Sequence, residues 1–311
     1  MKVIRIGVLL AAGILLAGGA VAGETSEPAP PLGLPAVPVP EDNPQTAEKI
    51  ALGDKLFNDK RFSSTGEVSC ATCHDPAKAF TDSPLKTSEG VNKLTGTRNA
   101  PTVVNAVYMK TQFWDGRSPS LEDQALHPPV NPVEGGLADH EPILEIVRTD
   151  PEYARAFEGV FGKTGEGITM DEVTKAIAAF ERTQVSGNSP FDRYYFNGEA
   201  DALTEAQKRG FDLFVNEGRC VSCHVVEQTT ALFTDNRFHN VGVGINDIQT
   251  EVPALAEEFL EAEAMLAEVD VTVLSDKRTS ELGRFAVTRG LDDLGSFKTP
   301  TLRNIAVTAP Y

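Results

Sequence analysis

The sequence predicts a mainly α-helical fold with long loops and little strand, built from two similar domains. Three observations lead to this prediction. A pentapeptide of the form Cys-x-x-Cys-His occurs once in each half of the chain, the residues around the two copies repeat, and the clearest local patterns are those of helices. Alternating apolar and polar residues, which indicate strands, are sparse.

The N-terminus has the pattern of a secretory signal. Lys2 and Arg5 precede a short apolar run, and the small residues Ala20-Val21-Ala22 form a cleavage pattern. We expect residues 1-22 to be a signal peptide and the mature protein to be in the periplasm. An uncleaved anchor is the alternative, although the run is short for a span of about 20 residues. The Pro- and Glu-rich residues 23-45 predict a linker.

The rest of the chain is long enough for two domains that each enclose a buried group. We expect an N-terminal domain over residues 46-186 and a C-terminal domain over residues 187-311. The formal net charge of -17 argues against binding to nucleic acid or to anionic lipid. An acidic surface fits a basic redox partner, or serves solubility alone.

All four cysteines belong to the two pentapeptides, which end in His74 and His224. Cys70 and Cys73 form the first pair, and Cys220 and Cys223 the second. In this motif the two thiols add to the haem vinyl groups and the adjacent His reaches the iron. The motifs therefore predict two covalently bound haem c groups, each enclosed by a cytochrome c-like domain. The alternatives are one zinc site shared by both pairs, which does not require the histidines, and a redox disulfide, which needs a strand–helix alternation that is not visible.

The residues on both sides of the motifs indicate an internal duplication. Gly53-Asp54-Lys55-Leu56-Phe57 precedes the first motif as Gly210-Phe211-Asp212-Leu213-Phe214 precedes the second, and Phe80-Thr81-Asp82 follows the first as Phe233-Thr234-Asp235 follows the second. Helix patterns fit this division. Capping boxes predict helices that begin after Thr169 and Thr204, and an acidic helix is expected between Glu251 and Asp270 with Leu255, Phe259 and Leu266 buried.

Several further motifs follow one another in a fixed order. They are Phe113-Trp114-Asp115-Gly116-Arg117, Leu121-Glu122-Asp123-Gln124-Ala125, Asn131-Pro132-Val133-Glu134, Phe238-His239-Asn240 and Phe297-Lys298-Thr299-Pro300-Thr301-Leu302-Arg303-Asn304. With the two haem motifs, they make the chain from Thr46 to Tyr311 resemble the bacterial di-haem cytochrome c peroxidases, including the MauG-like enzymes that mature methylamine dehydrogenase.

The resemblance implies a role for each motif. The first haem is the peroxidatic one and the second transfers electrons, with His74 and His224 as proximal iron ligands. Glu134 and Gln124 map to the distal pocket of the first haem, and Trp114 maps between the haems. The resemblance also implies a calcium ion held by Asn99 and by backbone oxygens of Thr308 and Pro310, ligands that suit a hard cation.

The chemistry of these residues agrees with the implied roles. Cleavage of peroxide requires one proton to move between its oxygens, which a carboxylate such as Glu134 can do. The Gln124 amide can position peroxide, and the Trp114 indole shortens the electron path. The alternative is that Glu134 is a solvated loop residue, Gln124 a surface residue and Trp114 ordinary core.

The chain departs from the family pattern at two places. Where many relatives have a histidine that caps the resting first haem, this sequence has Gly90-Val91, and no histidine occurs between His74 and His127. We expect an open first haem, with His127 at its rim and Met109 in the core. Relatives continue beyond the counterpart of Tyr311 and supply there a Met or, in MauG-like enzymes, a Tyr to the second haem. We expect the given sequence to stop before that ligand.

The expected activity is therefore the reduction of hydrogen peroxide to water, with electrons from a small periplasmic cytochrome c or cupredoxin. One alternative is a MauG-like enzyme that oxidises side chains of a partner protein. The other is a dihaem electron-transfer cytochrome without catalysis, which predicts two closed haems. A homodimer is one assembly that we consider for either kind of enzyme.

Overall fold

The computed structural model describes residues 29–261 and 275–310. The expected signal peptide 1-22 and Leu266 lie outside the described residues. The α-helices are α1 (Ala47–Phe57), α2 (Cys70–Cys73), α3 (Leu121–Gln124), α4 (His127–Val130), α5 (Glu141–Thr149), α6 (Pro151–Phe161), α7 (Met170–Glu181), α8 (Pro190–Asn197), α9 (Glu205–Val215), α10 (Val252–Glu261), α12 (Lys277–Ser280) and α13 (Phe285–Thr288). Short 3-10 helices interrupt the loops, two of which carry site residues, Val91–Lys93 and Cys220–Ser222.

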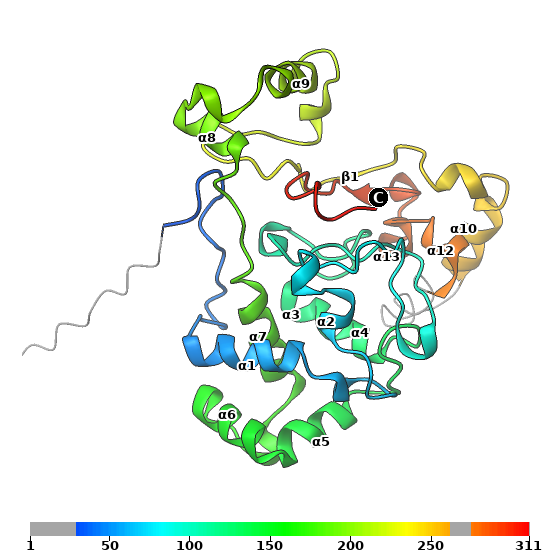
Figure 1. Cartoon of the computed structure of the whole chain (residues 1–311). Helices are drawn as coiled ribbons and strands as arrows, with labels where there is room; N and C mark the ends of the chain where they lie inside the picture. The colour runs from blue at the N-terminus through cyan, green and yellow to red at the C-terminus, as the bar shows by residue number, and fades with distance from the viewer. Residues whose placement is uncertain (1–28, 262–274, 311) are drawn as a thin grey trace, which may run out of the picture.

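The prediction of a mainly helical chain with little strand is confirmed. In the described residues the named strands are β1 (Phe238–His239) and β2 (Phe297–Lys298), which pair antiparallel with Phe238 opposite Lys298. In Figure 1, α1, α5, α6 and α7 lie together at the bottom, α8 and α9 form a lobe at the top, and α10, α12 and α13 lie on the right.

Helices begin where local side chains satisfy their first N–H groups. Both predicted capping boxes are present, one formed by Thr169 and Glu172 before α7 and the other by Thr204 and Gln207 before α9. Asp150 caps α6, whose first residue is Pro151. The α9 helix ends at Val215, and Gly218 lies in the turn that follows, where its N–H donates to the Leu213 carbonyl at 2.7 Å.

The main hydrophobic core forms where α1 packs along α7. Leu56 and Phe57 of α1 and Val173 and Ile177 of α7 are buried in it, with Phe157 from α6 beneath them. A second cluster joins α10 and α13 through Leu255, Phe259 and Phe285. The apolar positions expected for the acidic helix at Leu255 and Phe259 are thus confirmed.

The described part of the expected linker is packed onto the fold. Asn43 is fully buried, and its Nδ2 donates to Glu122 Oε1 at 2.7 Å and to the Lys175 carbonyl at 3.0 Å. Leu34 lies in a third core cluster, which includes Tyr108 and Leu121. The described part of the predicted linker 23-45 is thus an arm that buries apolar and polar groups against helices distant in sequence.

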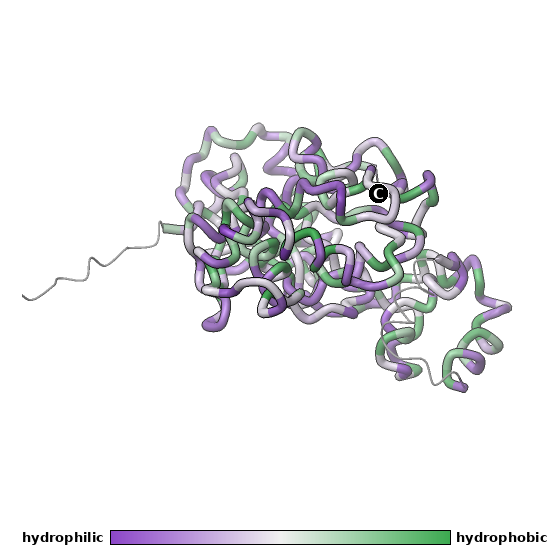
Figure 2. Tube along the Cα trace, turned by 90° about the horizontal axis from the view of Figure 1, so that it is seen from below, coloured by the Kyte–Doolittle hydropathy of each residue, from purple (hydrophilic) through white to green (hydrophobic). Residues whose placement is uncertain are grey.

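No helix among residues 29–261 and 275–310 is both long and apolar enough to span a membrane. Figure 2 shows hydrophobic and hydrophilic stretches alternating along the described trace.

Candidate functional site

The first motif forms the short helix α2, which presents His74 at its end. The Ser69 N–H donates to Thr72 Oγ1 at 2.9 Å and the His74 N–H donates to the Cys70 carbonyl at 2.9 Å. His74 Nδ1 lies 3.3 Å from the Phe80 carbonyl oxygen. Because a carbonyl only accepts, Nδ1 carries the proton and the Nε2 lone pair remains for a metal. Burial lowers the pKa of His74, which favours this neutral form.

The two cysteines of the first motif are half-buried, form no disulfide and carry protonated thiols. Burial raises the pKa of both Cys70 and Cys73 to about 12. Glu181 and then Cys73 add to the shift at Cys70, and Glu134 adds to it at both thiols. The carboxylate of Glu134 therefore lies close enough to influence both thiols of this motif.

The second motif holds His224 in the same way. Its Cys220–Ser222 turn leads to His224, whose N–H donates to the Cys220 carbonyl at 2.9 Å, and His224 Nδ1 lies 2.9 Å from the Phe233 carbonyl oxygen. Phe233 and its counterpart Phe80 both have positive φ, 52° and 57°. Bulky residues rarely adopt this conformation. The two motifs thus share an uncommon backbone feature.

Other contacts repeat around both histidines. The Phe57 ring centroid is 6.5 Å from that of His74, and the Phe214 centroid is 6.5 Å from that of His224. Thr102 Oγ1 donates to the carbonyl before Phe80 at 2.6 Å, and Thr301 Oγ1 to the carbonyl before Phe233 at 2.7 Å. These pairs align Pro101–Asn105 with Pro300–Asn304, a closer correspondence than the sequence alone revealed.

The residues present fit two covalently held haems. At the first motif, buried thiols and a neutral imidazole with a fixed tautomer form the donor set, and both carboxylate oxygens of the buried Asp82 lack a hydrogen-bond partner among the described residues. At the second motif, Cys220 is exposed, and Leu213 on the neighbouring α9 is 52% exposed. A planar apolar group attached at Cys220 and Cys223 covers such a surface.

Glu134 is placed by a close backbone approach from the Gly90–Val91 segment. The Val91 N–H donates to the Glu134 carbonyl at 2.9 Å, and Val91 is buried. A Cβ on Gly90 would lie 2.1 Å from the Val133 carbonyl oxygen and 2.6 Å from Glu134 Cα. The Gly90–Val91 segment is therefore fixed against the loop that carries Glu134.

Gln124 and His127 lie on the two short helices before Glu134. The half-buried Gln124 ends α3, and its side chain forms no hydrogen bond within the described residues. His127 begins α4, with Nε2 3.4 Å from Asp123 Oδ2 and its ring edge-on to Phe113 at 5.6 Å. Met109 packs with the Leu34 cluster, as expected for a core residue.

Trp114 lies at the junction of the two halves of the chain. Its Nε1 donates to the Asn99 carbonyl at 2.9 Å, and its own carbonyl accepts from the Lys298 N–H at 2.9 Å. The Asn99 amide donates to the Leu85 and Lys86 carbonyls at 3.5 and 3.4 Å. Thr308 is buried, and Pro310 follows a cis peptide bond. The calcium site at Asn99, Thr308 and Pro310 stays a prediction.

The sequence did not predict the burial of several ionisable residues, of which Glu181 and Lys298 are two. Glu181 ends α7 and is 7% exposed, and burial raises its pKa to about 8. Lys298 lies in β2 and is 9% exposed. The signal for Glu181 was its place at the end of the apolar stripe of Val173, Ile177 and Phe180, where a surface carboxylate is not expected.

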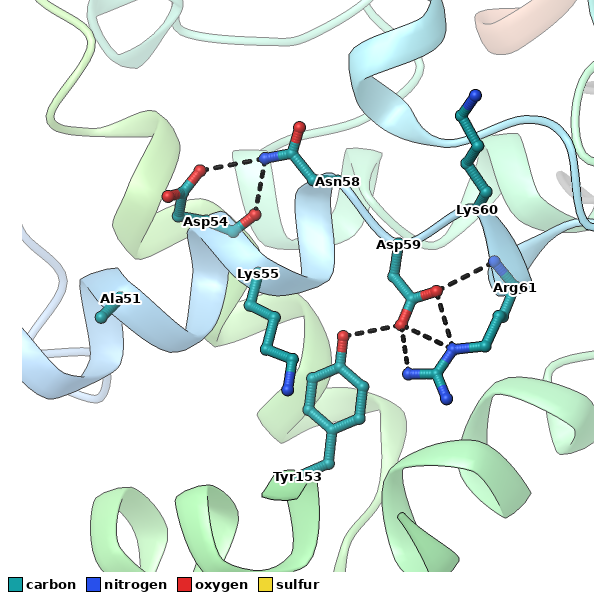
Figure 3. Close-up of a pocket in the computed structure, with 8 residues that line it drawn as sticks. All are labelled: Ala51, Asp54, Lys55, Asn58, Asp59, Lys60, Arg61 and Tyr153. Atoms are coloured by element: carbon teal, nitrogen blue, oxygen red, sulfur yellow. Dashed lines mark hydrogen bonds and ion pairs between the residues drawn. The ribbon is translucent and has the colours of Figure 1, made fainter. Parts of the chain in front are cut away.

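Two other features of the surface do not compete with these sites. Figure 3 shows a pocket beside α1 in which Asp59 Oδ2 accepts from Tyr153 Oη at 2.8 Å and Asp59 pairs with Arg61. The metal-type cluster in the described residues combines Cys223, Asp235 and His239. It does not unite the two cysteine pairs, as a shared zinc site requires.

Comparison with known proteins agrees with this geometry. The family model for the di-haem cytochrome c peroxidases matches residues 47–201. A cytochrome-c peroxidase of Pseudomonas sp. (strain SCT) is 37% identical, with 91% of this chain and 72% of that protein covered. The methylamine utilization protein MauG of Methylorubrum extorquens is 36% identical, with 89% and 67% covered.

A solved structure shows the same likeness. The crystal structure of a MauG-like protein associated with microbial copper homeostasis has a TM-score of 0.68 and 34% identity, and the match covers 90% of this chain and 75% of that one. On these matches, the chain belongs to the di-haem cytochrome c peroxidase family of oxidoreductases.

Proposed function

We propose that the protein reduces hydrogen peroxide to water at the first haem, in the periplasm, with electrons that enter through the second haem. The observation that carries the proposal is the position of Glu134. Its backbone is fixed by the Gly90–Val91 segment, and its carboxylate lies close enough to the first motif to help raise the pKa of both thiols.

Four cysteines and two histidines hold the cofactors. Cys70 and Cys73 attach the first haem c and His74 binds its iron, while Cys220, Cys223 and His224 do the same for the second. When bound, the two haems supply the redox equivalents for cleavage of the O–O bond. The hydrogen bonds from His74 Nδ1 and His224 Nδ1 to carbonyls fix both rings for this purpose.

Glu134 moves the proton and Gln124 positions the substrate. In this proposal the Glu134 carboxylate takes the proton from one peroxide oxygen and returns it to the other, so that water leaves. The Gln124 amide, which has no protein hydrogen-bond partner in the described residues, offers a donor and an acceptor to peroxide without taking its proton.

A haem held by the first motif would receive no side-chain ligand from Gly90 or Val91. Val91 is buried against the Glu134 loop, and a side chain at position 90 has no room. In this proposal the Gly90–Val91 segment holds Glu134 in position and would leave the iron of the first haem without a capping side chain.

Trp114 connects the two halves and carries electrons between the haems in this proposal. It is hydrogen-bonded to Asn99 in the first half and to Lys298 in the second. The repeated contacts around the two motifs support two cytochrome c-like domains, 46-186 and 187-311. A calcium ion at Asn99, Thr308 and Pro310 belongs to the same proposal.

The electron donor in this proposal is a small cytochrome c or a cupredoxin. The formal net charge of -17 favours a donor with a basic face, because opposite charges speed the encounter.

A second candidate is the oxidation of side chains on a partner protein. The absence of a histidine at positions 90 and 91 favours this alternative. A methylamine utilization protein MauG is 36% identical, about as similar as the cytochrome-c peroxidase at 37%.

The test is peroxide turnover by the full-length, haem-loaded protein, with and without a reduced small cytochrome c. The peroxidase proposal predicts oxidation of the donor in proportion to peroxide consumed. A protein that reacts with peroxide yet leaves several reduced donors untouched supports the second candidate. A protein whose haems both ignore peroxide is the electron-transfer cytochrome instead.

A further inference from the structure

Lys298 is a buried lysine attached to the segment that carries Trp114. Its side chain is 9% exposed. Its backbone N–H donates to the Trp114 carbonyl at 2.9 Å. Its Nζ donates to the carbonyl of Thr111, which lies three residues before Trp114. Both ends of Lys298 are therefore held against the same short stretch of chain.

The charge of Lys298 is not neutralised by an ion pair. In residues 29–261 and 275–310 no carboxylate pairs with it. Asp115 is the nearest influence, but its carboxylate already accepts two bonds of 3.0 Å from Arg117 Nη1. Arg284 Nη1 also donates to the carbonyls of Asp115 and Gly116, at 3.0 and 2.7 Å. The surroundings of Trp114 thus contain more cationic than anionic groups.

The protonation of Lys298 changes within an accessible pH range. Burial lowers its pKa to about 8, against the attraction of Asp115. Further charged or titratable groups lie near β2. Arg98 lies over the Phe297 ring and Arg284 over the Phe238 ring. Asp235, Arg237 and His239 lie in or beside β1, which pairs with β2. Asp235 and His239 form a pair of their own at 2.7 Å.

We propose that Lys298 controls the passage of electrons through Trp114, with its ammonium form opposing oxidation of the indole and its neutral amine permitting it. The proposal rests on the proposed function in one respect, that Trp114 connects the haems. In the step, Trp114 gives one electron to the first haem and takes one from the second. The indole keeps its Nε1 proton because its partner, the Asn99 carbonyl, is a weak base, and no atom is transferred.

The physical basis is Coulombic. A buried unit charge held against the segment that carries Trp114 raises the cost of placing a second positive charge on the nearby indole. Loss of the Lys298 proton removes that cost. An effect on the order of tenfold in the rate of electron passage corresponds to about 1.4 kcal/mol, which is modest for a buried unit charge.

The test uses the full-length, two-haem protein with its second haem reduced. One equivalent of peroxide is added in a stopped-flow spectrometer between pH 6.5 and 9.5, and reaction of the first haem and oxidation of the second are followed separately. We expect the second step to speed up about tenfold as pH rises through about 8. Lys298→Met should be fast and independent of pH, and Lys298→Arg, which keeps the charge, slow and independent of pH.

A matched control and an independent readout complete the test. Lys110→Met makes the same chemical change at an exposed lysine next to Thr111 and should leave the pH profile intact. NMR of ¹³C-labelled lysines should show one resonance, absent in Lys298→Met, that titrates near pH 8. The proposal is overturned if the wild type shows a normal first step followed by a second step that does not depend on pH. It is also overturned if the Lys298 resonance titrates as that of an exposed lysine does. A first haem that does not react with peroxide contradicts the proposed function instead.

Discussion

Arg303 and Asp192 form a bidentate ion pair that is buried on both sides, although 111 residues separate them. The two bonds measure 3.0 and 2.8 Å, and Arg303 also donates to the carbonyls of Gly33 and Ala231. Asp192 completes the cap of α8 with Ser189. One side chain thus ties the N-terminal arm, the α8–α9 lobe and the C-terminal segment together.

Replacement of Arg303 by Met should destabilise the folded protein by about 3–5 kcal/mol, because it leaves the Asp192 carboxylate buried without a counter-charge. The measurement is denaturant unfolding of the haem-loaded protein. Arg278→Met, which removes an exposed ion pair with Glu251 of 3.1 Å, should cost less than about 1 kcal/mol. Equal losses in the two variants would mean that the buried pair has no special role.

The pH dependence of this pair follows from its pKa. Burial opposes ionisation of Asp192, but the bonds from Arg303 and Ser189 outweigh it and hold the pKa below the ordinary 3.8. Its contribution to stability is therefore present above about pH 4 and is lost as pH falls through the lowered value.

Gly90→Ala should slow the reaction with peroxide while both haems remain attached. The added Cβ collides with backbone atoms of Val133 and Glu134, which have no flexible end to move away, so the distal carboxylate shifts. A displacement of this kind can cost on the order of a hundredfold in rate. The measurement is the stopped-flow rate of the first haem with peroxide. Gly96→Ala, where nothing lies within 4 Å, should react normally, and an unaffected Gly90→Ala protein would remove this segment from the mechanism.

Glu181 should make stability fall as pH rises from about 4.5 to about 8. Burial raises its pKa to about 8, with Arg182 opposing and Glu122 adding to the shift. The folded state therefore binds a proton that the unfolded state has lost, and this contribution disappears above the folded pKa. The melting temperature of Glu181→Gln, compared with wild type, should match it near pH 4 and exceed it at pH 9. A constant difference across this range contradicts the buried neutral acid.

The first haem should be high-spin in the resting oxidised protein. The structure packs Met109 into the core and fixes Gly90–Val91 against Glu134, so neither closes the sixth position. Electron paramagnetic resonance of the full-length oxidised protein should show a high-spin ferric signal. If only low-spin signals appear, a protein ligand closes the site. If that ligand is His127, the variant His127→Gln should restore the high-spin signal.

Features that depend on neighbouring residues in sequence were predictable from the sequence. The caps at Thr169 and Thr204 and the buried face of α7 follow from side chains within one or two turns of the helix. The thiols and histidines of the two motifs were predictable for the same reason, since the chemistry needs them at that spacing.

Features set by residues distant in the sequence were not predictable from it. Asn43 is buried because Glu122 and Lys175 meet it in space, so composition alone could not predict how the arm packs. The role of Gly90 depends on the approach of Val133 and Glu134, and the burial of Lys298 on the Trp114 segment. No local pattern in the sequence encodes these contacts.

The most direct test of the account is the reaction of Glu134→Gln with peroxide. The variant keeps the size of the side chain and removes its ability to move a proton, so the haem of the first motif should react about a hundredfold to ten-thousandfold more slowly. Glu145→Gln, the same change at an exposed position on α5, should react as wild type. Both are mixed with peroxide in a stopped-flow spectrometer after haem content is shown to be complete. A Glu134→Gln protein that reacts at the wild-type rate would contradict the central claim that this carboxylate serves peroxide cleavage.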